Sequence, residues 1–474
     1  MNIVSRKKEI DILKKITSSD KAEFVCVYGR RRVGKTYLIR EFYNDQFSFY
    51  ATGVFSKFKD EQLASFKASL FQYGDNNKKK IKDWFDAFER LKNLLETDKV
   101  YRHPVSKKRV VFLDELPWMD TPKSSFKVAL ERFWNTYASR KNDLVLIVCG
   151  SATSWIIKHL LQSRGGFYNR LTQKIHLSNF SLKECEELSR LYKLNLSRQQ
   201  LLEYYMVFGG VPYYLSLIDS SLSIAQNIDN LIFNPFGTLR DEYQLLFSSL
   251  FDGYELHKSI IEIISNHNKG LTKKQILSYL KIEANGSFQR AIEELEQSGF
   301  ITGINNYKNS VRETIYRVVD QFVLFSVAYQ KNHNINSWMN HLNSSEYKTW
   351  SGLSFEQVCM NNIDSIKDSL GILGVETKVY SFNSRESKPG AQIDFAIERS
   401  DRVINLCECK YSSNEYSISL SDKNNIENKI EVFNKETKNK KNIIVTFITV
   451  NGIKNNTYRD VAQKALTIDD LFLR

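Results

Sequence analysis

The segment spanning residues 24–44, FVCVYGRRRVGKTYLIREFYN, constrains the fold more than any other part of the chain. An apolar run ends at Gly29, and after four intervening residues Gly34 opens a helix-like stretch. Lys35 and Thr36 follow directly, which completes the G-x-x-x-x-G-K-T spacing of a phosphate-binding loop between a strand and a helix. The glycines let backbone N–H groups curl toward anionic oxygens, and Lys35 adds a positive charge for the β- and γ-phosphates. The sequence therefore predicts a nucleotide-binding site.

We expect the loop and the first residues of its helix to contact the nucleotide, with the Thr36 hydroxyl available to Mg²⁺. The candidate nucleotide-binding residues of this segment are Gly29, Arg30, Arg31, Arg32, Val33, Gly34, Lys35, Thr36 and Tyr37. The alternative interpretation is a basic surface turn, which the strand–loop–helix context disfavours.

Two acidic residues follow a second apolar run, at residues 110–113. Buried parallel strands are continuous apolar runs, and ligands collect at the carboxyl ends of such strands. We therefore expect Asp114 to hold Mg²⁺ through water and Glu115 to polarise the attacking water. The alternative is a pair of surface acids that caps a turn.

Further polar candidates follow a third apolar run, at residues 144–150. Ser151 lies at its end and could sense the γ-phosphate, cap the next helix, or do both. Arg164 and Arg170 flank a double glycine, and an arginine from the same subunit or a neighbouring one stabilises charge on a transferring phosphoryl group. Arg170 is the candidate for this role, with a plain salt bridge as the alternative.

Length, charge and cysteines set the remaining limits. A chain of 474 residues should form about three domains. The net charge of +13 lies mainly in residues 1–220. It favours a nucleic-acid partner only slightly, because a nucleotide site within a solvated basic surface also produces such an excess. No apolar run approaches the ~20 residues that cross a bilayer, and the polar N-terminus does not resemble a signal peptide. Six cysteines without a CxxC pair indicate reduced thiols and a cytoplasmic protein.

Five blocks in the first 220 residues, GRRRVGKT, FLDELPWM, VCGSATSWI, GGFYNRLTQKIHLSNF and FGGVPYYL, resemble the AAA+-type ATPases abundant in archaea and gut bacteria, which are relatives of the STAND NTPases. The resemblance implies ATP rather than GTP. It also implies phosphate binding by the loop, magnesium and water activation by Asp114 and Glu115, and sensing by Ser151. Arg170 lies in the arginine block of the family.

The stretch from 221 to 330 contains three helix-like segments and two strand-like ones, the pattern of a winged helix. Such a domain would favour DNA reading in the major groove. However, its third helix carries Glu293, Glu294 and Glu296 against Arg290, whereas a helix that meets phosphates should be basic. We therefore favour a structural or relay role over direct DNA binding.

The last third of the chain carries a second set of candidates. The segment AQIDFAIERSDRVINLCECKYS predicts a hairpin that places Asp394, Glu408 and Lys410 on one face, if the faces of its two strands coincide. Two carboxylates that hold Mg²⁺ beside a lysine that orients or deprotonates water would suit phosphodiester hydrolysis. The alternative is a charged edge-strand triplet in which both acids pair with Lys410.

This arrangement resembles the PD-(D/E)XK nuclease fold, with Glu356 on the preceding helix as a further metal ligand. The proline that often precedes the first acid is replaced by Ile393. The same fold is the expected C-terminal partner in the ATPase family named above. Because fold does not guarantee chemistry, cleavage itself stays open at this point.

We therefore expect an α/β protein with an AAA+-like P-loop ATPase domain and its lid at residues 1–220, a winged-helix-like domain at 221–330 and a nuclease-like domain at 331–474. ATP and Mg²⁺ are the expected cofactors. DNA and a second copy of the chain are candidate partners, and no membrane association is expected. Nucleotide state would control a Mg²⁺-dependent site that acts on DNA. The alternative is an ATP-gated switch or scaffold whose nuclease fold is silent and binds a partner.

Overall fold

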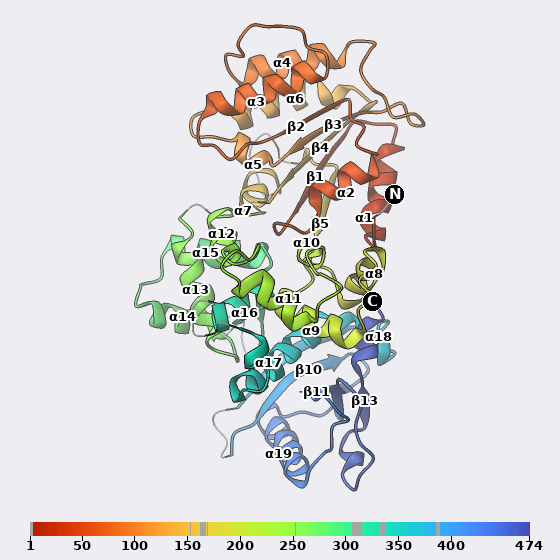
Figure 1. Ribbon diagram of the computed structural model, residues 1–474, viewed down its shortest axis with the longest axis vertical. Coiled ribbons are helices and arrows are strands. Elements are labelled where there is room, and N and C mark those ends of the chain that lie inside the picture. Colours follow the sequence, from red (N-terminus) through yellow and green to blue (C-terminus); the bar gives the residue numbers. More distant parts are fainter. Residues whose placement is uncertain are drawn as a thin grey trace. The chain divides into compact units, whose positions relative to one another are not determined.

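The computed structural model describes residues 3–151, 153–161, 167, 169–251, 253–305, 314–330, 335, 337–384 and 389–474. The chain divides into two compact units (Figure 1). The first consists of Met1–Ser178 with Ser249–Phe251, and the second of Asn179–Ser248 with Asp252–Arg474. Arg164, one of the two arginines that flank the double glycine, lies outside the described residues.

The first unit contains a five-stranded sheet in the order β2-β3-β4-β1-β5, in which all neighbouring strands are parallel. Its strands are β1 (Glu23–Gly29), β2 (Phe49–Thr52), β3 (Arg109–Asp114), β4 (Leu144–Gly150) and β5 (Gln173–Leu177). Because β4 lies between β3 and β1, the residues that follow these three strands meet at one edge of the sheet. The apolar-run criterion misses β5, since burial along this strand alternates.

Helices cover both faces of this sheet (Figure 1). They are α1 (Lys7–Thr17), α2 (Lys35–Phe42), α3 (Lys59–Gln72), α4 (Trp84–Leu95), α5 (Leu116–Met119), α6 (Phe126–Thr136) and α7 (Thr153–Ile156), with short 3-10 and π turns at Ala138–Arg140 and Ile157–Leu161. Phe24 and Cys26 of β1 enter the core with α3, α4 and α6, whereas Val25 and Val27 enter the core with α1 and α2. Burial on both faces explains why the central strands are unbroken apolar runs.

The start of α4 is set by Asp83. The side chain of Asp83 accepts a hydrogen bond from the backbone N–H of Asp86, and the helix begins at Trp84. An aspartate in this position satisfies a backbone donor that has no partner within the helix. The lysines at 78–82 therefore precede the helix.

The second unit begins with helices and a small sheet. Its first helices are α8 (Leu182–Leu191), α9 (Arg198–Phe208), α10 (Pro212–Leu215), α11 (Ile224–Ile228), α12 (Glu242–Ser248), α13 (Glu255–Ser265), α14 (Lys273–Leu280) and α15 (Gly286–Gln297), with a π turn at Asp229–Phe233. The strands β6 (Leu271–Thr272), β7 (Ile301–Ile304) and β8 (Ile315–Val318) form an antiparallel sheet in the order β6-β8-β7. Two acids of α15 are bound within this region, since Glu294 contacts His257 at 2.8 Å and Glu296 accepts from the backbone of Gly303 at 3.1 Å.

A mixed five-stranded sheet forms the rest of the second unit, in the order β13-β12-β11-β10-β9. The helices and strands of this part of the chain are α16 (Gln321–Phe325), α17 (Ser345–Asn361), α18 (Ile363–Ser369), β9 (Thr377–Asn383), β10 (Gln392–Arg399), β11 (Val403–Lys410), α19 (Leu420–Thr437), β12 (Asn442–Thr449) and β13 (Lys464–Leu466). Short turns lie at Ser326–Gln330, Met339–His341, Arg459–Val461 and Ile468–Phe472. The predicted hairpin is present as β10 and β11. Val432 and Phe433 of α19 pack on the sheet in one core with Ile404 and Leu406.

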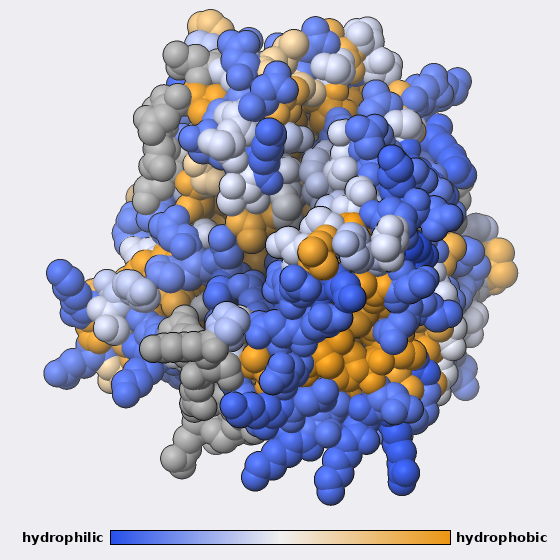
Figure 2. Space-filling model, turned by 90° about the horizontal axis from the view of Figure 1, so that it is seen from below, coloured by the Kyte–Doolittle hydropathy of each residue, from blue (hydrophilic) through white to orange (hydrophobic). Residues whose placement is uncertain are grey.

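The surface of the molecule is mixed in character. Figure 2 shows one face on which hydrophilic residues predominate, with hydrophobic residues gathered between them. None of the helices in the described parts of the chain is both long and apolar enough to span a bilayer. All six cysteines are free thiols.

Candidate functional sites

The loop between β1 and α2 has the backbone conformation that its glycines allow. Gly29, Arg32 and Gly34 have φ values of 146°, 69° and 92°. A Cβ on Gly29 would lie 2.2 Å from the backbone oxygen of Leu177 on β5, so both conformation and space require glycine there. The loop therefore turns tightly against the sheet edge before α2 begins.

Lys35 lies inside this loop. Its Nζ donates to the backbone oxygens of Gly29 at 3.0 Å and Arg30 at 2.9 Å. Burial lowers the pKa of Lys35, and the nearby carboxylates of Glu115 and Asp114 oppose that effect. The ammonium group is thus held at the loop by weak neutral acceptors, which phosphate oxygens can replace.

Thr36 and Asp114 meet across the sheet edge. The Thr36 hydroxyl donates to Oδ2 of Asp114 at 2.8 Å. The other oxygen, Oδ1, accepts from the backbone N–H of Glu115 at 2.9 Å and from the Cys149 thiol at 2.5 Å. Cys149 belongs to β4, which lies between β3 and β1 in the sheet. The carboxylate is therefore held by groups from β4, from the residue after β3, and from α2, the helix that follows β1. A hydroxyl and a carboxylate are ligands that Mg²⁺ prefers, and the pair therefore fits that ion.

Glu115 is held by Ser151. The Ser151 hydroxyl donates to Oε1 of Glu115 at 2.6 Å, and its backbone N–H donates to Oε2 at 3.2 Å. Glu115 has φ 45° and ψ 47°, a left-handed conformation that is uncommon for a residue other than glycine. Gly150 makes room for the turn, because a Cβ there would lie 2.4 Å from the Pro117 ring. Ser151 therefore positions Glu115, a role that the sequence interpretation did not include.

The remaining candidates of the loop differ in exposure. Arg30 and Val33 are buried, whereas Arg31 is half-buried and Tyr37 is about half exposed. The loop thus offers its backbone and Lys35 to an anion, while Tyr37 at the start of α2 faces solvent.

Arg170 lies far from these residues within its own chain. It is exposed and precedes β5, and the backbone N–H of Thr172 donates to the oxygen of Phe24 at the beginning of β1. Since β1 and β5 are parallel, Arg170 lies at the amino end of the sheet, about 17 Å of strand from Gly29. An arginine side chain cannot bridge that distance, so a role for Arg170 at the phosphates requires a second copy of the chain.

The second candidate site centres on β10 and β11. Their register pairs Phe395 with Cys407 and Ala396 with Leu406, which sets Glu408 opposite Asp394. On the other side of β10, the pairing with β9 shifts between Ile393 and Ala396, an irregularity that re-aims side chains. The hairpin therefore brings the two predicted carboxylates together.

Asp394 is half-buried at this point. Its Oδ2 accepts from the backbone N–H of Cys409 at 2.7 Å. Burial, with the carboxylates of Glu408 and Glu356 nearby, raises the pKa of Asp394 to about 8. The side chain thus holds its proton more tightly than an exposed aspartate does.

Glu408 binds two lysines. Lys410 contacts Oε1 at 2.9 Å, and Lys429 of α19 contacts Oε2 at 2.7 Å. Although burial lowers the pKa of Lys410, the Glu408 carboxylate outweighs this effect and raises it. Lys410 therefore stays charged, and it can orient a water molecule but is a poor base.

Lys429 is the residue of this site that the sequence interpretation missed. Its side chain is 10% exposed, less than the 27% of Lys410. A signal was present, because Lys429 interrupts the buried face of α19 that carries Ile426, Val432 and Phe433. A lysine within an apolar helical stripe usually has a buried acidic partner.

Glu356 on α17 pairs with an arginine. Arg317 of β8 contacts its Oε1 at 3.1 Å, and the two side chains are only 8% and 13% exposed. Burial raises the pKa of Glu356, while Arg317 opposes that change. The three carboxylates are the ligand type of Mg²⁺, but within the described residues no group of three or more His, Cys, Asp or Glu side chains is arranged to hold a metal ion.

Comparisons with known proteins show a family match over the part of the chain that contains the first site. Residues 3–218 match the family described as an ATPase domain predominantly from Archaea. An uncharacterized protein of Methanocaldococcus jannaschii is 23% identical over 330 residues, which cover 69% of this chain and 68% of that protein. An uncharacterized ATP-binding protein of the same organism is 49% identical over 39 residues, 8% of this chain and 66% of that protein.

Solved structures show only distant likeness. The Walker-type ATPase of Pyrococcus abyssi is 18% identical with a TM-score of 0.49, over 69% of this chain and 97% of that chain. The ORC2 protein of Aeropyrum pernix is 15% identical with a TM-score of 0.41, over 72% and 97% of the two chains.

Proposed function

We propose that this chain binds and hydrolyses ATP through the edge formed by β1, β3 and β4, since residues 3–218 match an ATPase domain found predominantly in Archaea. The observation that carries the proposal is the contact network of Thr36, Asp114, Glu115 and Ser151 beside Lys35. Four polar side chains and a buried ammonium group converge where the phosphate loop ends.

Each residue has a definite task in this proposal. The loop N–H groups and Lys35 bind the phosphates, as Lys35 exchanges the carbonyls of Gly29 and Arg30 for phosphate oxygens. Glu115, fixed by Ser151, orients the attacking water and accepts its proton. Thr36 and Asp114 would hold Mg²⁺, which supplies charge compensation for the phosphates.

The test is ATP hydrolysis by wild type, Lys35→Ala and Glu115→Gln. We expect Lys35→Ala to lose nucleotide binding, and Glu115→Gln to bind ATP without hydrolysing it at an appreciable rate. Full hydrolysis by both variants would refute the proposed site. The hydrolysis rate per chain should also be measured at increasing protein concentration. If Arg170 acts between copies, this rate rises with protein concentration, because the copies must first associate.

We extend the proposal to the second site, where Asp394, Glu408, Glu356 and the lysines would form a nuclease-like centre acting on DNA under the control of nucleotide state. Three carboxylates gathered around a hairpin, with Lys410 and Lys429 beside them, support it. The helices α13, α14 and α15 with their small sheet would then form a winged-helix-like relay. Control by ATP is motivated by the presence of both sites in one chain.

A second candidate function is an ATP-gated switch whose C-terminal fold is silent and binds a partner. The ion pairs favour it, since Arg317 and the two lysines already neutralise Glu356 and Glu408. Plasmid cleavage by wild type, Asp394→Ala and Lys35→Ala, with Mg²⁺ or Mn²⁺ and with or without ATP, separates the two. Cleavage that requires Asp394 supports the enzyme; no cleavage by wild type supports the switch; equal cleavage with and without ATP ends the idea of control.

A further inference from the structure

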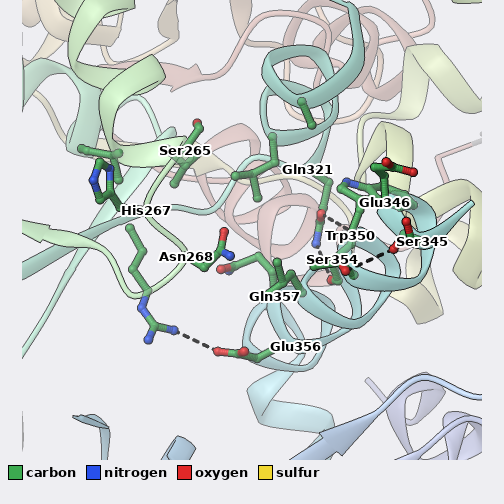
Figure 3. Close-up of a pocket in the computed structure, with 17 residues that line it drawn as sticks. Ser265, His267, Asn268, Gln321, Ser345, Glu346, Trp350, Ser354, Glu356 and Gln357 are labelled. Atoms are coloured by element: carbon green, nitrogen blue, oxygen red, sulfur yellow. Dashed lines mark hydrogen bonds and ion pairs between the residues drawn. The ribbon is translucent and has the colours of Figure 1, made fainter. Parts of the chain in front are cut away.

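A cavity with a mixed polar and apolar lining lies in the second unit, along one side of α17. It has a volume of about 450 Å³, within the range of small-molecule sites. One wall is α17 itself, from Ser345 to Gln357, and the other includes the end of α13, β8 and α16. Figure 3 shows His267 and Asn268 on one side and Trp350 on the other, with Gln321 between them. Glu356 lines this cavity and also belongs to the nuclease-like centre proposed above, which makes no other use of the cavity.

Arg317 provides the cavity with an anion-binding group. Its Nη1 contacts Glu356 Oε1 at 3.1 Å and the Met360 sulfur at 3.5 Å, and its buried Nε has no hydrogen-bond partner in the described structure. A guanidinium has five N–H donors and binds carboxylate or phosphate best with two parallel bonds. A single carboxylate oxygen and a weak sulfur acceptor therefore leave a buried Arg317 short of acceptors.

The middle of the cavity suits a planar ring. Trp350 and Glu356 both line the cavity from α17, and their separation of six residues corresponds to about 9 Å along the helix axis. Leu324 and Leu353 add apolar lining. The amide of Asn268 lies across from Trp350, and the amide of Gln357 lies on α17 about two turns further along the helix (Figure 3). Aromatic faces stack on heterocycles, and side-chain amides donate to and accept from the edges of such rings.

We propose that this cavity binds a small molecule that joins an anionic group to a planar heterocycle, the chemistry of a nucleoside monophosphate. The phosphate binds Arg317 in competition with Glu356, and the ring lies beside Trp350. The site differs from the phosphate loop, where Lys35 addresses the β- and γ-phosphates that a monophosphate lacks.

Isothermal titration of the full chain with AMP, GMP, CMP and UMP tests this proposal, with adenosine and inorganic phosphate for comparison. We expect at least one monophosphate to bind more tightly than adenosine and phosphate do. Thr349→Trp fills the cavity from an exposed position and should weaken that binding at least tenfold. Lys348→Trp, at the neighbouring exposed position that does not line the cavity, is the matched control and should bind as wild type.

Two further variants separate the alternatives. Lys35→Ala should bind the monophosphate as wild type does, and Arg317→Gln should reduce its affinity to that of the nucleoside. Absence of binding by all four monophosphates overturns the proposal, as does unchanged binding by Thr349→Trp. Loss of binding in Lys35→Ala alone would place the ligand at the phosphate loop and overturn it equally.

Discussion

The two candidate sites solve the problem of gathered carboxylates in different ways. At the edge of the first sheet, hydroxyl, thiol and backbone groups donate hydrogen bonds to Asp114 and Glu115. The nearby ammonium group of Lys35 donates to backbone carbonyls instead. In the second unit, Glu408 and Glu356 are held by full positive charges on Lys410, Lys429 and Arg317. Neutral donors leave an acid available to a cation, whereas a bound lysine or arginine must first be displaced. The carboxylates of the first site are therefore available to a cation, whereas the charges of Glu408 and Glu356 in the second site are already neutralised by lysine and arginine side chains.

The largest effect is expected for Glu115→Gln. Loss of a general base lowers hydrolysis by about 10²–10⁴-fold, while Lys35 and the loop keep ATP bound. Phosphate release and nucleotide binding should be measured side by side. Asp98→Asn, an exposed acid on the surface, is the control and should retain wild-type rates. Equal loss of binding and hydrolysis in Glu115→Gln would contradict a role confined to the chemical step.

Lys429→Met should destabilise the protein by about 3 kcal/mol, because it leaves the buried Glu408 with only its more exposed partner. Urea unfolding measures this change. The double variant Lys429→Met/Glu408→Gln should recover most of the loss, since the unpaired charge is then absent. If the double variant is less stable than the single one, the second site is not self-neutralised in the way described.

The pH dependence of Asp394→Asn sharpens the same comparison. The folded-state pKa of Asp394, about 8, lies above its ordinary value, so the native state binds more protons than the unfolded chain between about pH 4 and 8. The stability contributed by this group is present at low pH and is lost as pH rises through that window.

Asp394→Asn should therefore gain stability relative to wild type as pH rises from about 4 to 8, measured by urea unfolding in the presence of a chelator. Asp401→Asn is the control and should differ from wild type by a constant amount across this window, because Arg399 lowers the pKa of this exposed acid and it is ionised in both states above about pH 4. A constant difference between Asp394→Asn and wild type across this range would show that Asp394 is ionised throughout.

The smallest effect is expected for Ser151→Ala. It removes the hydroxyl bond to Glu115 but leaves the backbone N–H bond in place. A hydrogen bond to a charged group is worth about 1.5 kcal/mol, which corresponds to roughly a tenfold lower rate of hydrolysis. Steady-state kinetics should show the loss in kcat. A loss in KM alone would point instead to contact with the nucleotide.

Local patterns predicted the first site better than the second. The spacing of Gly29, Gly34 and Lys35 is a signal within one loop, and Asp114 follows an apolar run that could only be a buried strand. The sequence also predicted the hairpin of β10 and β11, because alternation and turn residues act over short distances. The bond from Ser151 to Glu115 could not be predicted, since it depends on the order of β3 and β4 in the sheet.

The pairing of Arg317 and Lys429 with the acids of the second site could not be predicted for the same physical reason. Arg317 and Glu356 are separated by 39 residues, and Glu408 and Lys429 by 21, so their pairing depends on how helices and sheets pack. For Arg170 the sequence left action within its own subunit or from a neighbouring one open. The parallel pairing of β5 with β1 puts this residue at the other end of the sheet from the loop, so action from a neighbouring copy is the alternative that stays a prediction.

The position of Glu356 has a consequence for any experiment on the second unit. The same carboxyl group forms part of the wall of the cavity beside α17 and contributes to the electrostatic environment of Asp394. A ligand that withdraws Arg317 removes its counter-charge, and the proton affinity of the whole acidic group must then rise. Proton uptake on ligand addition, recorded as a buffer-dependent heat, is thus a direct reporter that links the cavity to the sheet without any catalytic assay.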